Sequence, residues 1–299
     1  MTPPTPRWLL FSALVAVQVF FGFHYIAAKY IMTAIPPRAW ATLRAGSAAV
    51  LLMTFVLATR RRLPRAPRDL AALAFFSIFG VMINQVCFVE GLSRTDTSHA
   101  SIINSAIPVA TLLIAILLGR ERGTRGKILG IAVSLAGVIY LIGHSGAVLP
   151  RRFLTGDLLN VTNALSYSLF LVISRPILAR HGTLSVTAVL LAFGSAGIAT
   201  LGMGQLLELD FASVPPMIWL AAAAVVIFAT LGTYILSTWA LKRVESSQVA
   251  LFIYLQPVIA SVFAVVLLGE PLRAEAPISA VFIFTGLALA MRPAATRTA

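Results

Sequence analysis

The sequence predicts an all-α integral membrane protein, in which ten transmembrane helices form two inverted five-helix repeats and the N- and C-termini are cytoplasmic. Three observations lead to this fold class: an apolar composition, ten separate apolar stretches, and two halves that match at a constant offset. The 299 residues are 59% hydrophobic and 11% charged, and their mean hydropathy is +0.93. Soluble domains carry about 25% charged residues, so this chain is suited to a lipid bilayer.

The apolar stretches have roughly the 20-residue length that a helix needs to cross a bilayer. Short connections rich in proline, glycine and charge separate them, and none is long enough to form a soluble domain. Helices satisfy their backbone hydrogen bonds within one segment, whereas a barrel would show alternating polarity. We predict a single transmembrane domain over residues 1–299, with helices near 8–31, 41–58, 70–92, 99–118, 127–143, 157–179, 185–206, 216–239, 247–268 and 276–291.

The net charge of +13 is concentrated in the connections on one side. With the N-terminus inside, 16 of the 23 basic residues but only three of the ten acidic residues fall on the cytoplasmic side. Loops rich in basic residues tend to stay in the cytoplasm, so the charge distribution predicts this orientation. It also explains the positive net charge without nucleic acid as a partner. The single cysteine, Cys87, excludes an internal disulfide.

The two halves of the chain match without a gap at an offset of 149 residues. Because five helices are an odd number, the second repeat (about 157–291) enters the membrane from the side opposite to the first (about 8–143). Inverted repeats are typical of secondary transporters, which bind substrate between the repeats. The matched prolines are predicted to kink helices, either for gating or as static kinks. The matched glutamates are predicted to play a structural role between the repeats. These pairs are Pro108 with Pro257 and Glu121 with Glu270; Gly137 likewise matches Gly286.

Short motifs recur in both halves. The first half contains Gly22 through Lys29, Pro36, Arg44, Ile107-Pro108 and Leu118-Gly119-Arg120-Glu121, and the second contains Gly156-Asp157-Leu158, Tyr254-Leu255-Gln256-Pro257 and Leu268-Gly269-Glu270-Pro271. Over nearly the whole chain these motifs resemble the EamA domains of the drug/metabolite transporter superfamily. Within it, the chain is most similar to the bacterial exporters of aromatic amino acids (the YddG type). This resemblance implies export of a small molecule across the bacterial inner (plasma) membrane.

Polar and aromatic side chains within the predicted helices are candidates for binding substrate, because lipid penalises polar groups. Several share a helix face through spacings of three and four residues. The alternative is that they only form hydrogen bonds between helices. The candidates are Gln18, His24, Tyr25, Lys29, Asn84, Gln85, Phe88, Asn104, Asn163, Tyr167, Tyr234, Ser237 and Tyr254.

The charged residues bear on substrate and mechanism. All ten acids are expected at or near helix ends, which favours facilitated export over ion coupling; His24 remains a possible proton site. Lys29, Arg44 and Arg175 are also expected toward ends, which argues against phosphorylated sugars. We therefore expect a neutral or zwitterionic substrate with an apolar body, foremost an aromatic or other apolar amino acid, with a lipophilic cation or drug or a purine as alternatives.

Other functional classes are less favoured. An enzyme would need a deep acid pair or a zinc-binding His-Glu-x-x-His helix, and the sequence contains neither. No metal or cofactor is expected. A channel or a membrane receptor remains an alternative from another class. Ten helices with an internal dyad can enclose a cavity alone, so a monomer is expected to suffice.

Overall fold

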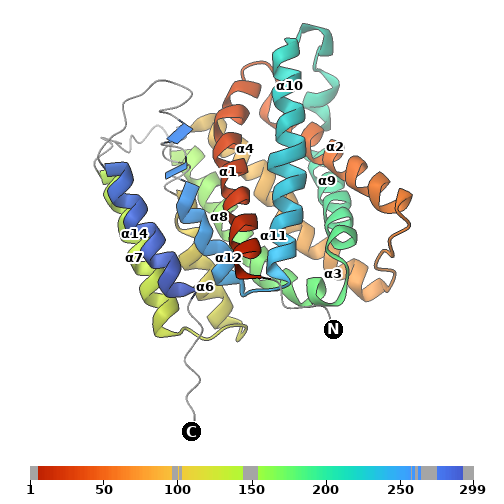
Figure 1. Ribbon diagram of the computed structural model, residues 1–299. Coiled ribbons are helices and arrows are strands. Elements are labelled where there is room, and N and C mark those ends of the chain that lie inside the picture. Colours follow the sequence, from red (N-terminus) through yellow and green to blue (C-terminus); the bar gives the residue numbers. More distant parts are fainter. Residues whose placement is uncertain are drawn as a thin grey trace.

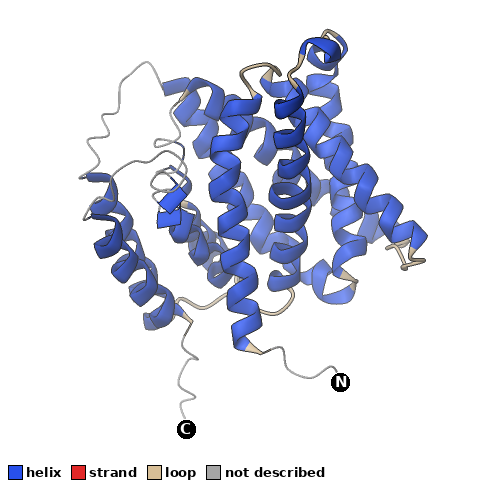
Figure 2. Cartoon of the chain, turned by 45° about the horizontal axis from the view of Figure 1, so that its top comes forward, coloured by secondary structure: helices blue, strands red, loops and turns tan. Residues whose placement is uncertain are grey.

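The computed structural model describes residues 6–95, 100, 103–143, 154–256, 258–259, 262–263 and 275–291. Every regular element in these ranges is helical (Figures 1 and 2), which confirms the all-α prediction. The helices are α1 (Arg7–Ile31), α2 (Pro37–Ala58), α3 (Pro67–Ser77), η1 (Ile78–Ile83), α4 (Asn84–Arg94), α6 (Ile107–Leu117), α7 (Arg125–Gly143), α8 (Leu154–Arg180), α9 (Thr183–Leu207), η3 (Phe211–Ser213), α10 (Pro216–Ala224), η4 (Val225–Gly232), α11 (Thr233–Leu241), α12 (Ser246–Leu251), η5 (Phe252–Tyr254) and α14 (Glu275–Ala290).

Six helical segments in the described ranges are long and apolar enough to cross a membrane. Four are the single helices α1, α2, α8 and α9, and two are the composite runs α3–η1–α4 and α10–η4–α11. Shorter apolar helices cover Ile107–Leu117 and Pro277–Ala290. Large apolar side chains also face outward, as at Leu117 (83% exposed) and Leu207 (79% exposed). Such a surface suits lipid rather than water, so the chain is a multi-pass membrane protein.

Prolines mark the starts of several helices. Pro37, Pro67 and Pro216 lie in the first turns of α2, α3 and α10, where the missing N–H has no intrahelical partner to lose. Pro108 likewise lies in the first turn of α6, directly after a turn at residues 105–106. Pro108 therefore begins a helix instead of bending a continuous one. Pro257 and Glu270 lie outside the described residues.

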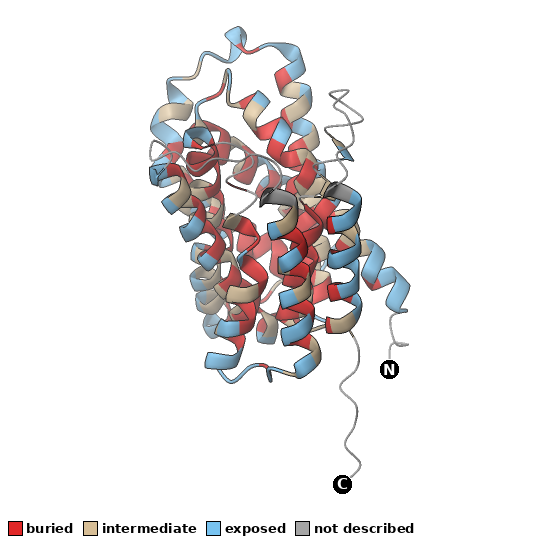
Figure 3. Ribbon diagram, turned by 90° about the vertical axis from the view of Figure 1, so that its left-hand side faces the viewer, coloured by how far each residue is buried: buried red, intermediate tan, exposed pale blue. Residues whose placement is uncertain are grey.

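Glycines allow close packing in two helix pairs, α2 with α9 and α7 with α14, which lie side by side in Figure 1. A Cβ atom on Gly202 of α9 would lie 2.5 Å from the carbonyl oxygen of Arg38. A Cβ on Gly286 of α14 would lie 2.1 Å from Oγ of Ser134 and 2.4 Å from the carbonyl oxygen of Gly130. Small residues at such contacts let helix backbones approach closely in membranes. Figure 3 shows the buried residues gathered on the faces that the helices turn toward one another.

Several structural features recur at the offset of 149 residues. The π-helical segment η1 interrupts the composite run α3–η1–α4, and η4 interrupts α10–η4–α11 at the matching place. Matched residues also contact each other: Oγ of Ser134 donates to the carbonyl of Ile283 at 3.3 Å, and Nε2 of Gln85 donates to Oη of Tyr234 at 3.3 Å. Two copies related by a twofold axis touch through equivalent residues only close to that axis, so both contacts suit a shared axis.

Candidate functional site

A cavity lies among α1, α2, α4, α8 and α11, between the inner faces of the helices. Its volume of about 60 Å³ leaves room for a few water molecules. Ligand pockets usually measure about 300–1,000 Å³, so the cavity is contracted in this conformation. The lining consists of Phe21, His24, Tyr25, Arg44, Asn84, Gln85, Phe88, Asn104, Ile107, Asn163, Tyr167, Phe170, Ala229, Thr230, Thr233, Tyr234, Ser237, Thr238, Ile253 and Gln256.

Three of the residues predicted to bind substrate lie outside this lining. Gln18 contacts a lining residue, because its Oε1 accepts a hydrogen bond from Nε2 of Gln256 at 2.9 Å. Lys29, in the last turn of α1, donates instead to the carbonyl of Thr95 at 2.8 Å. Tyr254 is fully buried elsewhere. The structure brings the other predicted residues together in the cavity: His24, Tyr25, Asn84, Gln85, Phe88, Asn104, Asn163, Tyr167, Tyr234 and Ser237.

The cavity also contains Arg44 of α2, which was expected near a helix end. That expectation was wrong because α2 begins at Pro37 rather than near residue 41, so Arg44 lies about 10 Å along the helix axis. Only 4% of the residue is exposed. Its Nε and Nη2 donate to Oε1 of Gln85 at 3.1 and 2.9 Å, and its Nη1 lies 2.5 Å from Nε2 of His24. Pro36-Pro37 as a helix start was the sequence signal that could have located it.

Arg44 has no acidic partner among the described residues. Every ion pair recorded for that part of the chain joins other side chains. No aspartate or glutamate is among the described residues that line the cavity. A guanidinium cannot lose its proton in a protein, so the cavity holds a permanent positive charge with only neutral hydrogen-bond acceptors.

A chain of amide groups crosses the cavity from α4 to α1. Nδ2 of Asn84 donates to Oδ1 of Asn163 at 2.7 Å, and Nδ2 of Asn163 donates to Oδ1 of Asn104 at 3.1 Å. Asn104 in turn donates to the hydroxyl of Tyr25, which donates to Oε1 of Gln256 at 3.4 Å. These buried polar groups satisfy one another without any charge. Each also offers a donor or an acceptor to a molecule that enters.

Aromatic rings form much of the remaining wall. His24 stacks on Phe88 with ring centroids 5.0 Å apart, and Tyr25 meets the edge of Phe88 at 5.4 Å. On α8, Tyr167 stacks on Phe170 at 6.2 Å. Aromatic walls with a few polar groups are the usual composition of a small-molecule site. The cavity therefore combines a cation, neutral amides and apolar surface.

Tyr234 lines the cavity and joins the two halves of the chain. Its hydroxyl accepts from Gln85 and donates to the carbonyl oxygen of Gly80 at 2.5 Å. Gly80 lies in η1, and π-helical turns are frequent at functional sites because they disturb the regular backbone hydrogen bonds. A side chain on Gly80 would collide with Phe170, since a Cβ there would lie 2.2 Å from that ring.

Comparison with known proteins assigns the family. The model of the EamA-like transporter family matches residues 7–143 and again 154–292. The chain belongs to the EamA-like transporter family. It is a multi-pass membrane transporter built from two EamA segments.

Relatives of this EamA protein come from bacteria, archaea and plants. It is 22% identical to an uncharacterized transporter, YyaM of Bacillus subtilis, with 93% of this chain and 92% of the relative covered. It is 23% identical to an uncharacterized transporter of Archaeoglobus fulgidus (96% and 99% covered). It is 26% identical to Protein WALLS ARE THIN 1 of Arabidopsis thaliana (89% and 78% covered). A crystal structure with 21% identity has the same fold, with a TM-score of 0.76 and coverage of 93% and 97%.

Charged clusters lie at both ends of α1 in this EamA protein. Near its C-terminal end, Nε of Arg38 lies 2.7 Å from Oε1 of Glu90, and Arg94 pairs with the same carboxylate. Near its N-terminal end, Arg7 and Trp8 border a groove that also contains a buried cluster around Glu121. The cavity lies between these two clusters.

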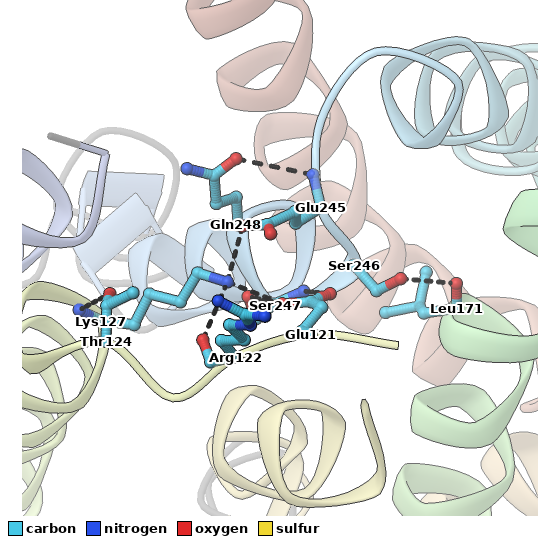
Figure 4. A network of polar contacts seen from close by, with 9 residues as sticks. All are labelled: Glu121, Arg122, Thr124, Lys127, Leu171, Glu245, Ser246, Ser247 and Gln248. Atoms are coloured by element: carbon cyan, nitrogen blue, oxygen red, sulfur yellow. Dashed lines mark hydrogen bonds and ion pairs between the residues drawn. The ribbon is translucent and has the colours of Figure 1, made fainter. Parts of the chain in front are cut away.

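The cluster around Glu121 links the two halves (Figure 4). Glu121, in the connection between α6 and α7, accepts hydrogen bonds from the backbone N–H of Ser247 at 3.2 Å and from the Ser247 hydroxyl. Nζ of Lys127 lies 3.0 Å from Oε2 of Glu121 and 2.5 Å from Oε2 of Glu245. Glu121 thus ties the first half to the start of α12 in the second half.

Proposed function

We propose that the protein transports a small carboxylate with an aromatic or apolar body by alternating access. Aromatic amino acids, the substrates that the sequence favoured, belong to this class. One observation carries the proposal: Arg44 is buried in the cavity without an acidic partner among the described residues. Since a buried cation is costly when unpaired, an anionic group is the ligand that this cavity lacks.

The chemistry of Arg44 favours a carboxylate over other anions. A guanidinium presents a planar fork of N–H donors, which binds a carboxylate through two parallel hydrogen bonds. Phosphate groups would need further cations, and Arg44 is the only Lys or Arg side chain among the lining residues described. The aromatic rings of Phe88 and Phe170 offer contacts for the body of the substrate.

The cavity disfavours a cation and leaves room for a zwitterion. Cation carriers prefer a buried acid, and the described lining contains none. An ammonium group needs acceptors, which the amide oxygens of Asn84, Asn104 and Asn163 provide. An amino acid therefore fits with its carboxylate at Arg44 and its ammonium near the amide chain. A purine would use the amides but would leave the arginine charge unbalanced.

The same proposal includes the inverted ten-helix architecture with cytoplasmic termini. The matched π-helical segments and the contacts of Ser134 with Ile283 and of Gln85 with Tyr234 support a twofold axis through the cavity. Several lining residues are related by the same offset, such as Phe21 with Phe170. We propose that one chain in the bacterial inner membrane carries out transport. Net export follows when the internal concentration of the substrate is the higher one.

Alternating access agrees with the contracted cavity. A site that exposes its substrate to one side at a time must close around it, and repeat-based transporters do so by rocking one repeat against the other. The clusters around Glu90 and Glu121 join different helices at opposite ends of α1. They are suited to close the two ends in turn.

Counterflow in proteoliposomes tests the proposal with three probes that share one aromatic body. L-phenylalanine carries a carboxylate and an ammonium, 3-phenylpropionate only the carboxylate, and 2-phenylethylamine only the ammonium. We expect exchange of the first two and none of the third. Arg44→Gln is expected to lower exchange by roughly 30- to 150-fold, because hydrogen bonds to a charged group contribute about 2–3 kcal/mol.

Two controls accompany this experiment. Arg243→Gln removes a cation that lies over the ring of Trp239 outside the cavity, and it is expected to leave exchange unchanged. Protein-free liposomes measure passive leakage of the probes. Exchange of 2-phenylethylamine, or full exchange by the Arg44→Gln variant, would contradict a carboxylate site. Unitary currents in planar bilayers would instead indicate a channel.

A further inference from the structure

His24 and Arg44 are in contact inside the cavity, and the contact determines the protonation of the imidazole. Nη1 of Arg44 lies 2.5 Å from Nε2 of His24. Arginine N–H groups only donate hydrogen bonds, so Nε2 of His24 must accept and cannot carry a proton. His24 is therefore neutral in this state, with its proton on Nδ1.

Nδ1 of His24 has no hydrogen-bond partner among the described residues. The residue is only 2% exposed, and it lines the cavity. One ring nitrogen thus depends on Arg44, and the other is a buried donor that protein groups leave unsatisfied. Both nitrogens become available to a ligand when Arg44 turns toward that ligand.

We propose that the protein co-transports a proton with its substrate and that His24 binds this proton. The inference rests on the proposed carboxylate transport and adds coupling to it. When the carboxylate takes the N–H groups of Arg44, Nε2 of His24 loses its donor and accepts a proton from water on the open side. After the site opens to the other side, the carboxylate leaves and the proton returns to water there. Arg44 then donates to Nε2 again.

Electrostatics determines whether proton binding and carboxylate binding favour or oppose each other. Without substrate, a protonated His24 would place two positive charges 2.5 Å apart in a site of low dielectric constant, where like charges repel strongly. A bound carboxylate cancels one of them and favours the imidazolium. Proton and carboxylate therefore bind cooperatively, and each raises the affinity for the other by the same factor. Such coupling is symport, so the substrate and proton gradients together set the direction of transport. Net export then requires an outward substrate gradient larger than any inward proton gradient.

Among the groups around the cavity, His24 is the one suited to bind the transported proton. The segments α10 and η4, which pack against α1, carry no titratable side chain. Glu90 of α4 is already paired with Arg38 and Arg94. The titratable or charged side chains on the other elements around His24 are Arg38 and Arg44 of α2, Cys87, Glu90 and Arg94 of α4, Tyr234 of α11 and Tyr254 of η5. Unperturbed, none of these titrates between pH 5 and 8 as imidazole does.

Proton uptake on binding tests the proposal in detergent, without a membrane. Addition of 3-phenylpropionate to the weakly buffered protein near pH 7 is expected to remove up to about one proton from solution per molecule bound. The affinity is expected to fall several-fold from pH 6 to pH 8. His24→Gln retains an acceptor for Arg44 but does not titrate, so it is expected to bind the probe without proton uptake. The matched control His181→Gln, at a histidine bonded to Asp69 at 2.7 Å, is expected to behave as the unmodified protein.

A flux measurement completes the test. With the membrane potential clamped, acid outside is expected to increase L-phenylalanine accumulation several-fold in proteoliposomes of the unmodified protein and of His181→Gln, but not of His24→Gln. If the unmodified protein binds the probe without taking up a proton, the coupling is overturned but the carboxylate site is not, whether or not His24→Gln binds the probe. Equal proton uptake by His24→Gln would overturn the assignment of His24. Failure to bind either carboxylate probe would overturn the proposed function, and the coupling with it.

Discussion

Lys127 and Arg44 are both buried cations, but their surroundings differ. Lys127, 6% exposed, lies within 3.0 Å of Glu121 and 2.5 Å of Glu245. Arg44, 4% exposed, has only the neutral acceptors of Gln85 and His24 among the described residues. The first cation is therefore paired with two carboxylates, whereas no described carboxylate neutralises the second.

The presence or absence of carboxylate partners distinguishes a cation that stabilises the fold from a cation that we propose binds a ligand. A buried charge that protein groups neutralise contributes to holding the fold, and its removal leaves the opposite charges stranded. A buried charge that no protein group neutralises is a cost to the empty protein, and an anionic ligand offsets that cost. The predictions below test whether stability depends on Lys127 and its partners and whether ligand binding depends on Arg44.

The largest expected effect is the loss of stability when Lys127 is replaced by methionine. Glu121 would remain buried without a cation, and breaking a buried ion pair in this way costs about 3–5 kcal/mol. Thermal unfolding in detergent, followed by circular dichroism, measures the change. Arg44→Met strands no opposite charge, and the same measurement is expected to show a much smaller loss. Equal losses of stability in Lys127→Met and Arg44→Met would contradict the difference between the two buried cations.

A double variant isolates the ion pair. Replacing Lys127 by methionine and Glu121 by glutamine together removes both charges, so most of the lost stability is expected to return. Continued instability of the double variant would assign the effect to packing around the methylene groups of Lys127.

A smaller effect is expected for Arg44→Lys. The ammonium keeps the charge but replaces a planar fork by a single point donor, which reaches less far and cannot contact Gln85 and a carboxylate in parallel. We expect about a tenfold weaker affinity for 3-phenylpropionate, equal to about 1.4 kcal/mol, measured by calorimetry in detergent. An affinity as low as that of Arg44→Gln would show that geometry matters more than charge, and an unchanged affinity would refute bidentate binding.

The smallest effect is expected for Ser247→Ala at the cluster around Glu121. The carboxylate loses the serine hydroxyl but keeps the backbone N–H of Ser247 and the ammonium of Lys127. A loss of about 1 kcal/mol in the free energy of unfolding follows for one hydrogen bond. Ser12→Ala, at an exposed hydroxyl bonded within α1, is the control and is expected to change stability less. An unchanged free energy of unfolding in Ser247→Ala would contradict a stabilising hydrogen bond at this hydroxyl.

Much of the fold follows from local properties of the sequence. The described helices α8 (Leu154–Arg180) and α9 (Thr183–Leu207) lie within a few residues of the stretches predicted at 157–179 and 185–206. Hydropathy works here because each helix must satisfy its own backbone in lipid, so a span is encoded within its own 20 residues. Helical spacing also predicted that Asn84 and Phe88 share one face of a helix with Gln85 beside them, and all three residues line the cavity.

The sequence by itself determined the membrane class, the approximate bounds of the six long apolar segments described, and most of the polar residues in the cavity. Only the tertiary structure decided which buried cation is paired with carboxylates and which lacks an acidic partner among the described residues. Arg44 meets His24 and Gln85, which lie 20 and 41 residues away along the chain, and Glu121 meets Ser247 126 residues away. Burial and pairing of a charge depend on groups that packing brings together from distant segments, and no local pattern of residue types records those contacts.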